Sequence, residues 1–94
     1  MKKYGIEELA NMNSTELGNI NQEYDEIMEK LHTSYTEPRI EIYSNKVDTA
    51  EDETSCHFNF VNLVYWKRYD VEDALNNFLK TATSQQILSM LNNL

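Results

Sequence analysis

The sequence predicts a small α+β fold, in which a long N-terminal helix and a C-terminal helical pair cover a two-stranded antiparallel hairpin. Three observations lead to this prediction: an amphipathic stripe in the first third of the chain, two runs typical of β-strands in the middle, and two helix-start patterns near the C-terminus. The 94 residues are 40% hydrophobic and include only two Gly and one Pro, which suits one folded domain, residues 1–94. The expected order of elements is α-β-β-α-α.

The first predicted element is a long helix over residues 14–32. Asn13 and Glu16 form the pattern of a capping box at its start, in which each side chain bonds to the backbone N–H of the other residue. Apolar residues then recur at steps of three and four, which places them in one stripe along a helix. The stripe consists of Leu17, Ile20, Tyr24, Ile27, Met28 and Leu31. Ahead of it, Ile6 and Leu9 indicate a short helical turn on the same core.

The first predicted strand follows a proline. Pro38 ends the helical pattern, because proline disfavours the helical conformation in the residue before it. Residues 39–43 alternate polar and apolar side chains, which predicts a strand with Ile40 and Ile42 facing inward. Residues 44–55 have almost no large apolar side chain, so they are expected to form a long acidic hairpin loop.

The second predicted strand covers residues 56–66, which are rich in Phe, Val, Tyr and Trp. Its part from Phe60 to Trp66 is apolar on both faces. Such a strand either lies in the centre of a sheet or presents one face to a partner chain.

Two helices are predicted after this strand. Asp70 can serve as the N-cap of the first, which is expected to end near Lys80. Thr83 and Gln86 form another capping-box pattern at the start of the second. The apolar stripe of that last helix consists of Ile87, Leu88, Leu91 and Leu94.

No pattern in the chain is typical of a catalytic or cofactor site, and we predict that the protein is not an enzyme. Cys56 and His57 are neighbours, but adjacent side chains in a strand point to opposite faces and cannot act as a nucleophile and base. The same geometry argues against zinc, and residues 48–53 lack the order and the glycine of a calcium loop. Neither a metal nor a cofactor is expected.

The expected compartment is the cytoplasm. Cys56 is the only cysteine, which excludes an internal disulfide, and the first nine residues lack the apolar stretch of a signal peptide. No apolar run approaches the roughly 18 residues of a transmembrane helix, so no membrane association is expected.

The charge of the chain indicates the kind of partner. Sixteen Asp and Glu against eight Lys and Arg give a net charge of −8. Binding to a phosphate backbone depends on Lys and Arg that displace counterions, so nucleic acid is not expected as a direct partner. The expected partner is a basic protein, most simply one that itself binds nucleic acid.

Acidic residues supply the predicted binding surface. Carboxylates three or four residues apart on a helix are about 5–6 Å apart, comparable with the spacing of phosphates, so a row of them can imitate a nucleic-acid backbone. Tyrosines in loops or on an outward face can anchor such a contact. The predicted partner-binding residues are Glu23, Glu26, Tyr35, Glu41, Tyr43, Asp48, Glu51, Asp52 and Glu53. The alternative is that the charge only keeps a small domain soluble.

In size, charge and lack of catalytic motifs, the chain resembles the small acidic inhibitors encoded by phages and mobile elements, including anti-CRISPR and other nucleic-acid-mimic proteins. This resemblance is one of composition, and it implies an inhibitor that blocks a basic, nucleic-acid-binding protein. The alternative function is a structural or assembly module that forms a homodimer through the strand from Phe60 to Trp66.

Overall fold

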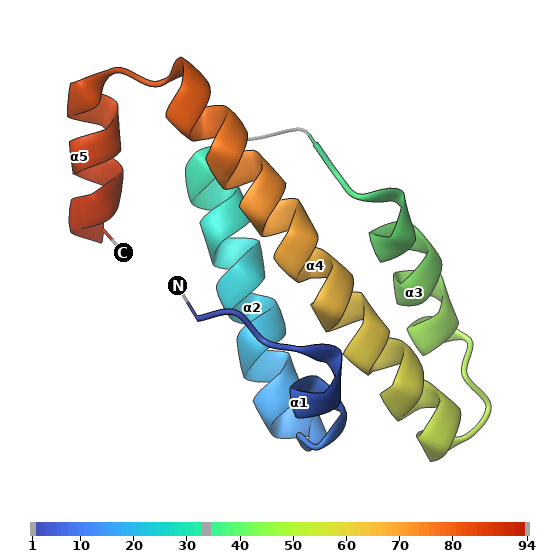
Figure 1. Ribbon diagram of the computed structural model, residues 1–94. Coiled ribbons are helices and arrows are strands. Elements are labelled where there is room, and N and C mark those ends of the chain that lie inside the picture. The colour runs from blue at the N-terminus through green and yellow to red at the C-terminus, as the bar shows by residue number, and fades with distance from the viewer. Residues whose placement is uncertain (1, 33–34, 94) are drawn as a thin grey trace.

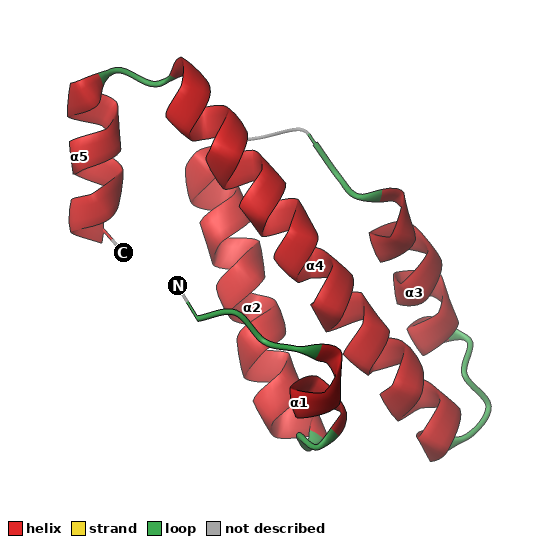
Figure 2. Ribbon diagram, in the orientation of Figure 1, coloured by secondary structure: helices red, strands yellow, loops and turns green. Residues whose placement is uncertain are grey.

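A long central helix organises the molecule. The computed structural model describes residues 2–32 and 35–93, and all regular structure within these ranges is helical (Figures 1 and 2). The helices are α1 (Ile6–Ala10), α2 (Ser14–Leu31), α3 (Pro38–Asp48), α4 (Glu53–Thr81) and α5 (Ser84–Asn93). Helix α4 packs against α1, α2 and α3, while α5 lies apart near the C-terminal end of α4 (Figure 1). The result is an elongated molecule of 48 × 22 × 17 Å.

The core lies where α1 and α2 meet α4. Figure 1 shows α2 running in the same direction as α4, and the predicted apolar stripe of α2 faces it. The fully buried side chains include Leu9 of α1, Leu17 of α2, and Val64 and Val71 of α4. The buried cluster consists of Leu9, Leu17, Ile20, Tyr24, Ile27, Leu31, Val61, Val64, Val71 and Ala74. One apolar interface therefore holds the two N-terminal helices against the distant helix α4.

The prediction of α2 and of a short helix before it is confirmed. The backbone N–H of Glu16 donates to Asn13 Oδ1 at 2.9 Å, and the N–H of Asn13 donates to Glu16 Oε1 at 3.4 Å. The helix ends at Leu31, one residue earlier than expected, because His32 adopts a left-handed conformation with φ of 49°. A left-handed residue directly after a helix is a common way to end it.

The predicted α+β fold is wrong, and the first predicted strand is part of α3. Pro38 starts this helix instead of breaking the helical pattern. At the first helical position a backbone N–H has no intrahelical acceptor, so a proline, which lacks this N–H, costs no hydrogen bond there. The fixed φ of proline also suits the helix. The side chain of Glu37 caps the helix by accepting a hydrogen bond from the N–H of Arg39. Ile40 is half-buried, but Ile42 is 51% exposed, so the two do not share an inward face.

The second predicted strand is part of α4. Asp52 caps the start of α4, because its Oδ1 accepts a hydrogen bond of 2.7 Å from the N–H of Ser55. The buried residues Val61, Val64 and Val71 then follow a helical spacing and face α2. Packing against α2 overrides the strand propensity of the aromatic and β-branched residues. The predicted hairpin loop is replaced by the end of α3, a short connection and the first turn of α4.

The predicted helix start at Asp70 is also wrong, because α4 continues through this residue. Asp70 is buried, and its Oδ1 accepts a hydrogen bond of 3.0 Å from the N–H of Glu37 at the start of α3. It therefore ties two helices together. The last helix is as predicted, and both hydrogen bonds between Thr83 and Gln86 are present. Leu94, assigned to its apolar stripe, lies outside the described residues.

Candidate protein-binding surfaces

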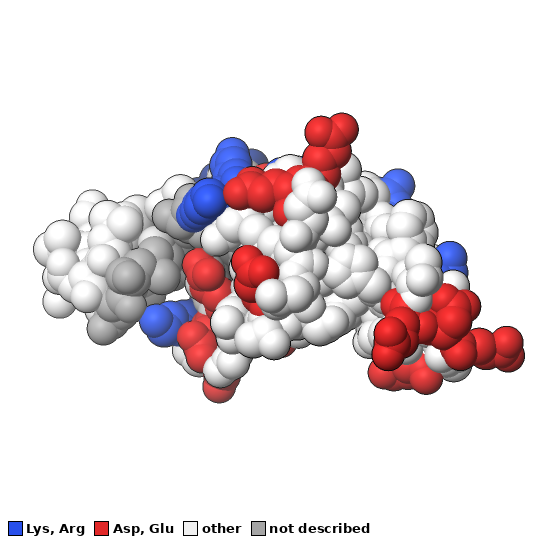
Figure 3. All heavy atoms as spheres, turned by 90° about the horizontal axis from the view of Figure 1, so that it is seen from below, with Lys and Arg blue, Asp and Glu red and all other residues white. Residues whose placement is uncertain are grey.

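Four of the predicted partner-binding residues gather at one end of the molecule. Helix α3 runs antiparallel to α4, so their short connection brings the last residue of α3 close to the first residues of α4. Figure 3 shows the resulting cluster of acidic side chains at that end. We call this surface the acidic end, and it consists of Asp48, Glu51, Asp52 and Glu53, all of them exposed.

The carboxylates of the acidic end have no ion-pair partner in the part of the chain that the structure describes. Within residues 2–32 and 35–93, no Lys or Arg forms an ion pair with any of its four carboxylates. Asp52 has an additional structural role, because it accepts hydrogen bonds from the N–H and the hydroxyl of Ser55. These hydrogen bonds hold the pKa of Asp52 below its usual range. The acidic end therefore presents a net negative charge at neutral pH.

Glu41 extends this surface along α3. Glu41 precedes Asp48 by seven residues, which is close to two helical turns, so both exposed side chains lie on the same face of α3. Tyr43, also predicted as a contact residue, is half-buried, and the Lys46 ammonium lies 5.1 Å from the centroid of its ring. Glu41 is thus available to a partner, whereas the ring of Tyr43 already has a cation beside it.

The other predicted residues lie elsewhere. Glu23 and Glu26 are exposed on α2, which packs on a different side of α4 from α3. Tyr35 precedes α3 and is 40% exposed in a cleft beside Asp70, towards the other end of α3 from the acidic end. The predicted residues consequently fall into three groups: an acidic surface on α3, α4 and their connection, a separate acidic face on α2, and two tyrosines, of which Tyr35 lies in the cleft.

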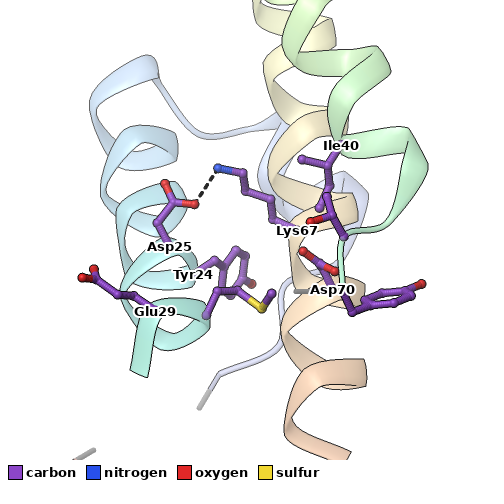
Figure 4. A pocket seen from close by; sticks show the side chains of 9 residues that line it. Tyr24, Asp25, Glu29, Ile40, Lys67 and Asp70 are labelled. Atoms are coloured by element: carbon purple, nitrogen blue, oxygen red, sulfur yellow. Dashed lines mark hydrogen bonds and ion pairs between the residues drawn. The ribbon is translucent and has the colours of Figure 1, made fainter. Parts of the chain in front are cut away.

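The cleft beside Tyr35 contains the most unusual ionisable groups of the molecule. It lies between α2, α4 and the start of α3, and its volume is about 350 Å³ (Figure 4). Lys67 reaches from α4 to α2, where its ammonium lies 2.8 Å from Asp25 Oδ1. Burial raises the pKa of the Asp70 carboxyl, and burial raises the pKa of the Tyr24 hydroxyl to about 12.

These groups act as ties between helices. The Lys67–Asp25 ion pair joins α4 to α2, and the hydrogen bond from Glu37 to Asp70 joins α4 to α3. Lys67, Asp25 and Asp70 therefore have partners within the fold, whereas the buried hydroxyl of Tyr24 has no hydrogen-bond partner among the described residues. The arrangement offers no nucleophile beside a base, and the absence of enzymatic activity stays a prediction.

Cys56 and His57 lie on a helix, so the strand geometry assumed for them is wrong. The sulfur of half-buried Cys56 lies 4.0 Å from the carbonyl oxygen of Val47 in α3. The Nε2 atom of His57 lies 3.3 Å from the carbonyl oxygen of Ala10 in α1. The two side chains thus contact different helices and are not arranged as a nucleophile and base.

The described residues contain neither a metal-binding cluster nor a membrane-spanning helix. Among the described residues, no three His, Cys, Asp or Glu side chains are placed to hold a metal ion. None of the helices in that part of the chain is both long and apolar enough to cross a membrane.

An aromatic cluster on α4 is a feature that the sequence prediction missed. The rings of Tyr65, Trp66 and Tyr69 lie 5.0 to 5.4 Å from one another. The Arg39 guanidinium of α3 lies 4.0 Å from the centre of the Trp66 ring, and Arg68 lies over both tyrosines. The spacing of 65, 66 and 69 places the three on one side of a helix, but not of a strand. This cluster helps to hold α3 against α4.

A second missed feature is an exposed apolar face on α5. Leu88 is 60% exposed and Leu91 is 58% exposed, and Leu79 near the end of α4 is 45% exposed. Residues 81–93 include no Asp, Glu, Lys or Arg. The two ends of the molecule therefore differ sharply in chemistry.

Comparisons with known proteins give no further assignment: no family model, no curated protein and no solved structure matches this chain.

Proposed function

We propose that this chain is a cytoplasmic binding protein that occupies a basic, nucleic-acid-binding surface of another protein. The observation that supports this proposal is the acidic end, where four exposed carboxylates from the end of α3, the start of α4 and the connection between them gather without an ion-pair partner in the described chain. A partner occupied in this way loses access to nucleic acid. The chain then acts as an inhibitor, as small acidic proteins of phages and mobile elements do.

The charge of the acidic end would act mainly on the rate of encounter. Complementary charge steers two proteins together and fixes their orientation more than it adds to final affinity. Affinity also needs buried apolar contact, and the hairpin of α3 and α4 exposes apolar side chains near its acids. Ile42 is adjacent to Glu41 and is 51% exposed, and Phe58 of α4 is 63% exposed. These two side chains would supply apolar anchors beside the acidic surface.

The proposal is tested by reversing charge at the acidic end. The variant carries Asp48→Lys, Glu51→Lys and Glu53→Lys, and it retains Asp52 because that side chain caps α4. Tagged wild-type and variant proteins are used to capture partners from host lysate at low salt, followed by elution with increasing salt and mass spectrometry. We expect the wild-type protein to retain a basic, nucleic-acid-binding protein that salt releases, and the variant to lose it.

The matched control reverses the same number of charges on α2, with Glu23→Lys, Glu26→Lys and Glu29→Lys. Loss of capture in the first variant but not in the second supports a site at the acidic end. The opposite result moves the site to α2. Equal loss in both variants means that net charge alone governs binding, and a retained partner that does not respond to salt contradicts the electrostatic mechanism.

Self-association is the second candidate function, but not through the surface first predicted. The segment from Phe60 to Trp66 is helical and contributes Val61 and Val64 to the core, so it cannot add a strand to a second copy. The exposed apolar face of α5 is the observation that supports self-association as the second candidate function.

A further inference from the structure

The charges that line the cleft between α2, α4 and the start of α3 do not balance. The lining contains three carboxylates, those of Asp25, Glu29 and Asp70, and the single cation Lys67. The Lys67 ammonium lies 2.8 Å from Asp25 Oδ1, so these two charges neutralise each other. Among the described residues, no Lys or Arg forms an ion pair with Glu29 or Asp70. The described residues therefore leave a net negative charge in the cleft.

Asp70 is the most deeply buried of these carboxylates. It is 5% exposed, and the N–H of Glu37 donates to its Oδ1 at 3.0 Å. Burial raises the pKa of Asp70 in spite of this hydrogen bond, and the nearby carboxylates of Glu37 and Asp73 add to the rise. The two oxygens of a carboxylate have about four acceptor sites, so one N–H leaves room for further donors. A cation that carries N–H donors would offset the unfavourable burial of this charge.

The hydroxyl of Tyr24 is a second buried group that a ligand can satisfy. Tyr24 is 1% exposed, and its hydroxyl has no hydrogen-bond partner among the described residues. Its ring lines the cleft, and Figure 4 shows the side chain pointing from α2 towards α4. Burial raises the pKa of this hydroxyl to about 12, so it keeps its proton at neutral pH. Buried polar groups without a partner are unusual, and the oxygen can accept a hydrogen bond from a donor on a ligand.

A guanidinium suits these groups better than an ammonium does. It carries five N–H donors in a fixed plane, and it is more weakly hydrated, so its burial is less unfavourable. Its flat face also packs against aromatic rings, and the ring of Tyr35 lines the cleft. The fold uses the same contact elsewhere, because the Arg39 guanidinium lies 4.0 Å from the centre of the Trp66 ring. The cleft volume of about 350 Å³ accommodates a guanidinium on a short alkyl chain.

We propose that this cleft binds a guanidinium group, carried by an arginine side chain or by a small free molecule. The carboxylate of Asp70 and the hydroxyl oxygen of Tyr24 accept its N–H donors, and the ring of Tyr35 covers one face. The exposed carboxylate of Glu29 adds negative charge. The cleft lies towards the other end of α3 from the acidic end, so this site does not depend on the proposed inhibitory function.

The test follows the backbone amide signals of isotope-labelled protein by NMR during titration with ethylguanidinium. We expect saturable shifts confined to residues around the cleft. Ethylammonium should bind at least fivefold more weakly, and ethylurea, which is planar but uncharged, should give no saturable shift. An arginine in the middle of a glycine tripeptide distinguishes the two sources of the group. Binding of the tripeptide assigns the cleft to a protein side chain, and its exclusion assigns the cleft to a small free molecule.

Two variants examine the residues of the site. Asp70→Asn keeps an oxygen that can accept the hydrogen bond from Glu37 but removes the charge, and it should weaken binding of ethylguanidinium more than tenfold. The matched control is Asp48→Asn, which removes one carboxylate at the acidic end and should change binding less than twofold. Tyr24→Phe keeps the ring and removes an unpartnered hydroxyl, so it should weaken binding severalfold without unfolding the protein.

Three results overturn the proposal: no saturable shift with ethylguanidinium, equal binding of ethylammonium or ethylurea, or equal weakening by the Asp48 control. An unfolded Asp70 variant would be recognised from its NMR spectrum, and the Tyr24 variant then decides. Undiminished binding by the folded Tyr24 variant contradicts the site.

Discussion

Helices α2 and α5 are capped in the same way at their N-terminal ends, but their side chains are buried to different extents. Each starts with a complete capping box, formed by Asn13 and Glu16 in α2 and by Thr83 and Gln86 in α5. Each carries an apolar stripe. Five side chains of α2 are buried, whereas α5 has no fully buried side chain among those described. The capping signal and the periodicity therefore specify a helix, but the neighbouring helix decides whether its stripe becomes core.

The largest expected effect comes from truncating one leucine in each helix. Leu17 of α2 is fully buried, and Leu17→Ala should lower the free energy of unfolding by about 2–5 kcal/mol, through lost apolar burial and the cavity left behind. Leu91→Ala in α5 should change it by less than about 0.5 kcal/mol. Urea unfolding of both variants at low protein concentration measures the two changes in free energy. Similar losses in the two variants would mean that α5 belongs to the same cooperative core as α2.

A smaller difference is expected when the N-caps are removed. Asn13→Ala should lower the free energy of global unfolding by about 1 kcal/mol, because the N–H groups at the start of α2 lose their partner. Thr83→Ala should instead increase amide hydrogen exchange within α5 and leave global unfolding nearly unchanged, since the helix can fray on its own. Hydrogen exchange together with urea unfolding distinguishes the two. A Thr83 variant with a full loss of global stability would contradict independent fraying.

The smallest expected effect concerns the hydrogen bond between the buried Asp70 of α4 and Glu37 at the start of α3. Because burial raises the pKa of Asp70 in the folded state, its contribution to stability is complete below the usual carboxyl pKa of about 4 and is lost as the pH rises through the raised value. Asp70→Asn keeps an oxygen that can accept the hydrogen bond from Glu37 but cannot ionise.

The variant should thus gain stability relative to the wild-type protein as pH increases from acidic to neutral. Urea unfolding of both proteins across this range gives the difference directly. A difference that does not change with pH would show that Asp70 ionises equally in the folded and unfolded chains.

The sequence was sufficient to predict α2 and α5, because each has a complete local signal, while the apolar residues Ile6 and Leu9 indicated α1 without a capping pattern. Asn13 and Glu16 mark a helix start without reference to the rest of the chain, as do Thr83 and Gln86. The middle of the chain was mispredicted because its signals were interpreted over short windows. Residues 39–43 alternate in polarity, but Pro38 occupies the first position of a helix, and no Gly or Pro follows it to end one.

The error in α4 has a related cause. The apolar residues from Phe60 to Trp66 occur on both faces of a strand, yet Val61, Val64 and Val71 fit one side of a helix when the window extends past Asp70. Aspartate is a residue type that often caps helices. Only the folded structure shows that Asp70 instead accepts a hydrogen bond from the N–H of Glu37 at the start of α3.

The surface was predicted in part. The exposure of Asp48, Glu51, Asp52 and Glu53 agrees with the predicted acidic segment. Their separation from Glu23 and Glu26 depends on how α2 and α3 pack against α4, which local patterns do not contain. Leu88 was assigned to an apolar stripe, but no sequence signal indicated that this stripe lacks a neighbouring helix.

The length of α4 makes the two ends of the molecule electrostatically independent. Its 29 residues span about 43 Å at 1.5 Å per residue. The Debye length at physiological ionic strength is about 8 Å, so charge at one end is screened several times over before it reaches the other. Added salt should therefore act on the two ends in opposite directions: it weakens contacts made by carboxylates, and a strongly hydrated salt such as sulfate strengthens contacts made by leucines. The length of one helix thus separates a surface that responds to salt through its charge from a surface that responds through its apolar side chains.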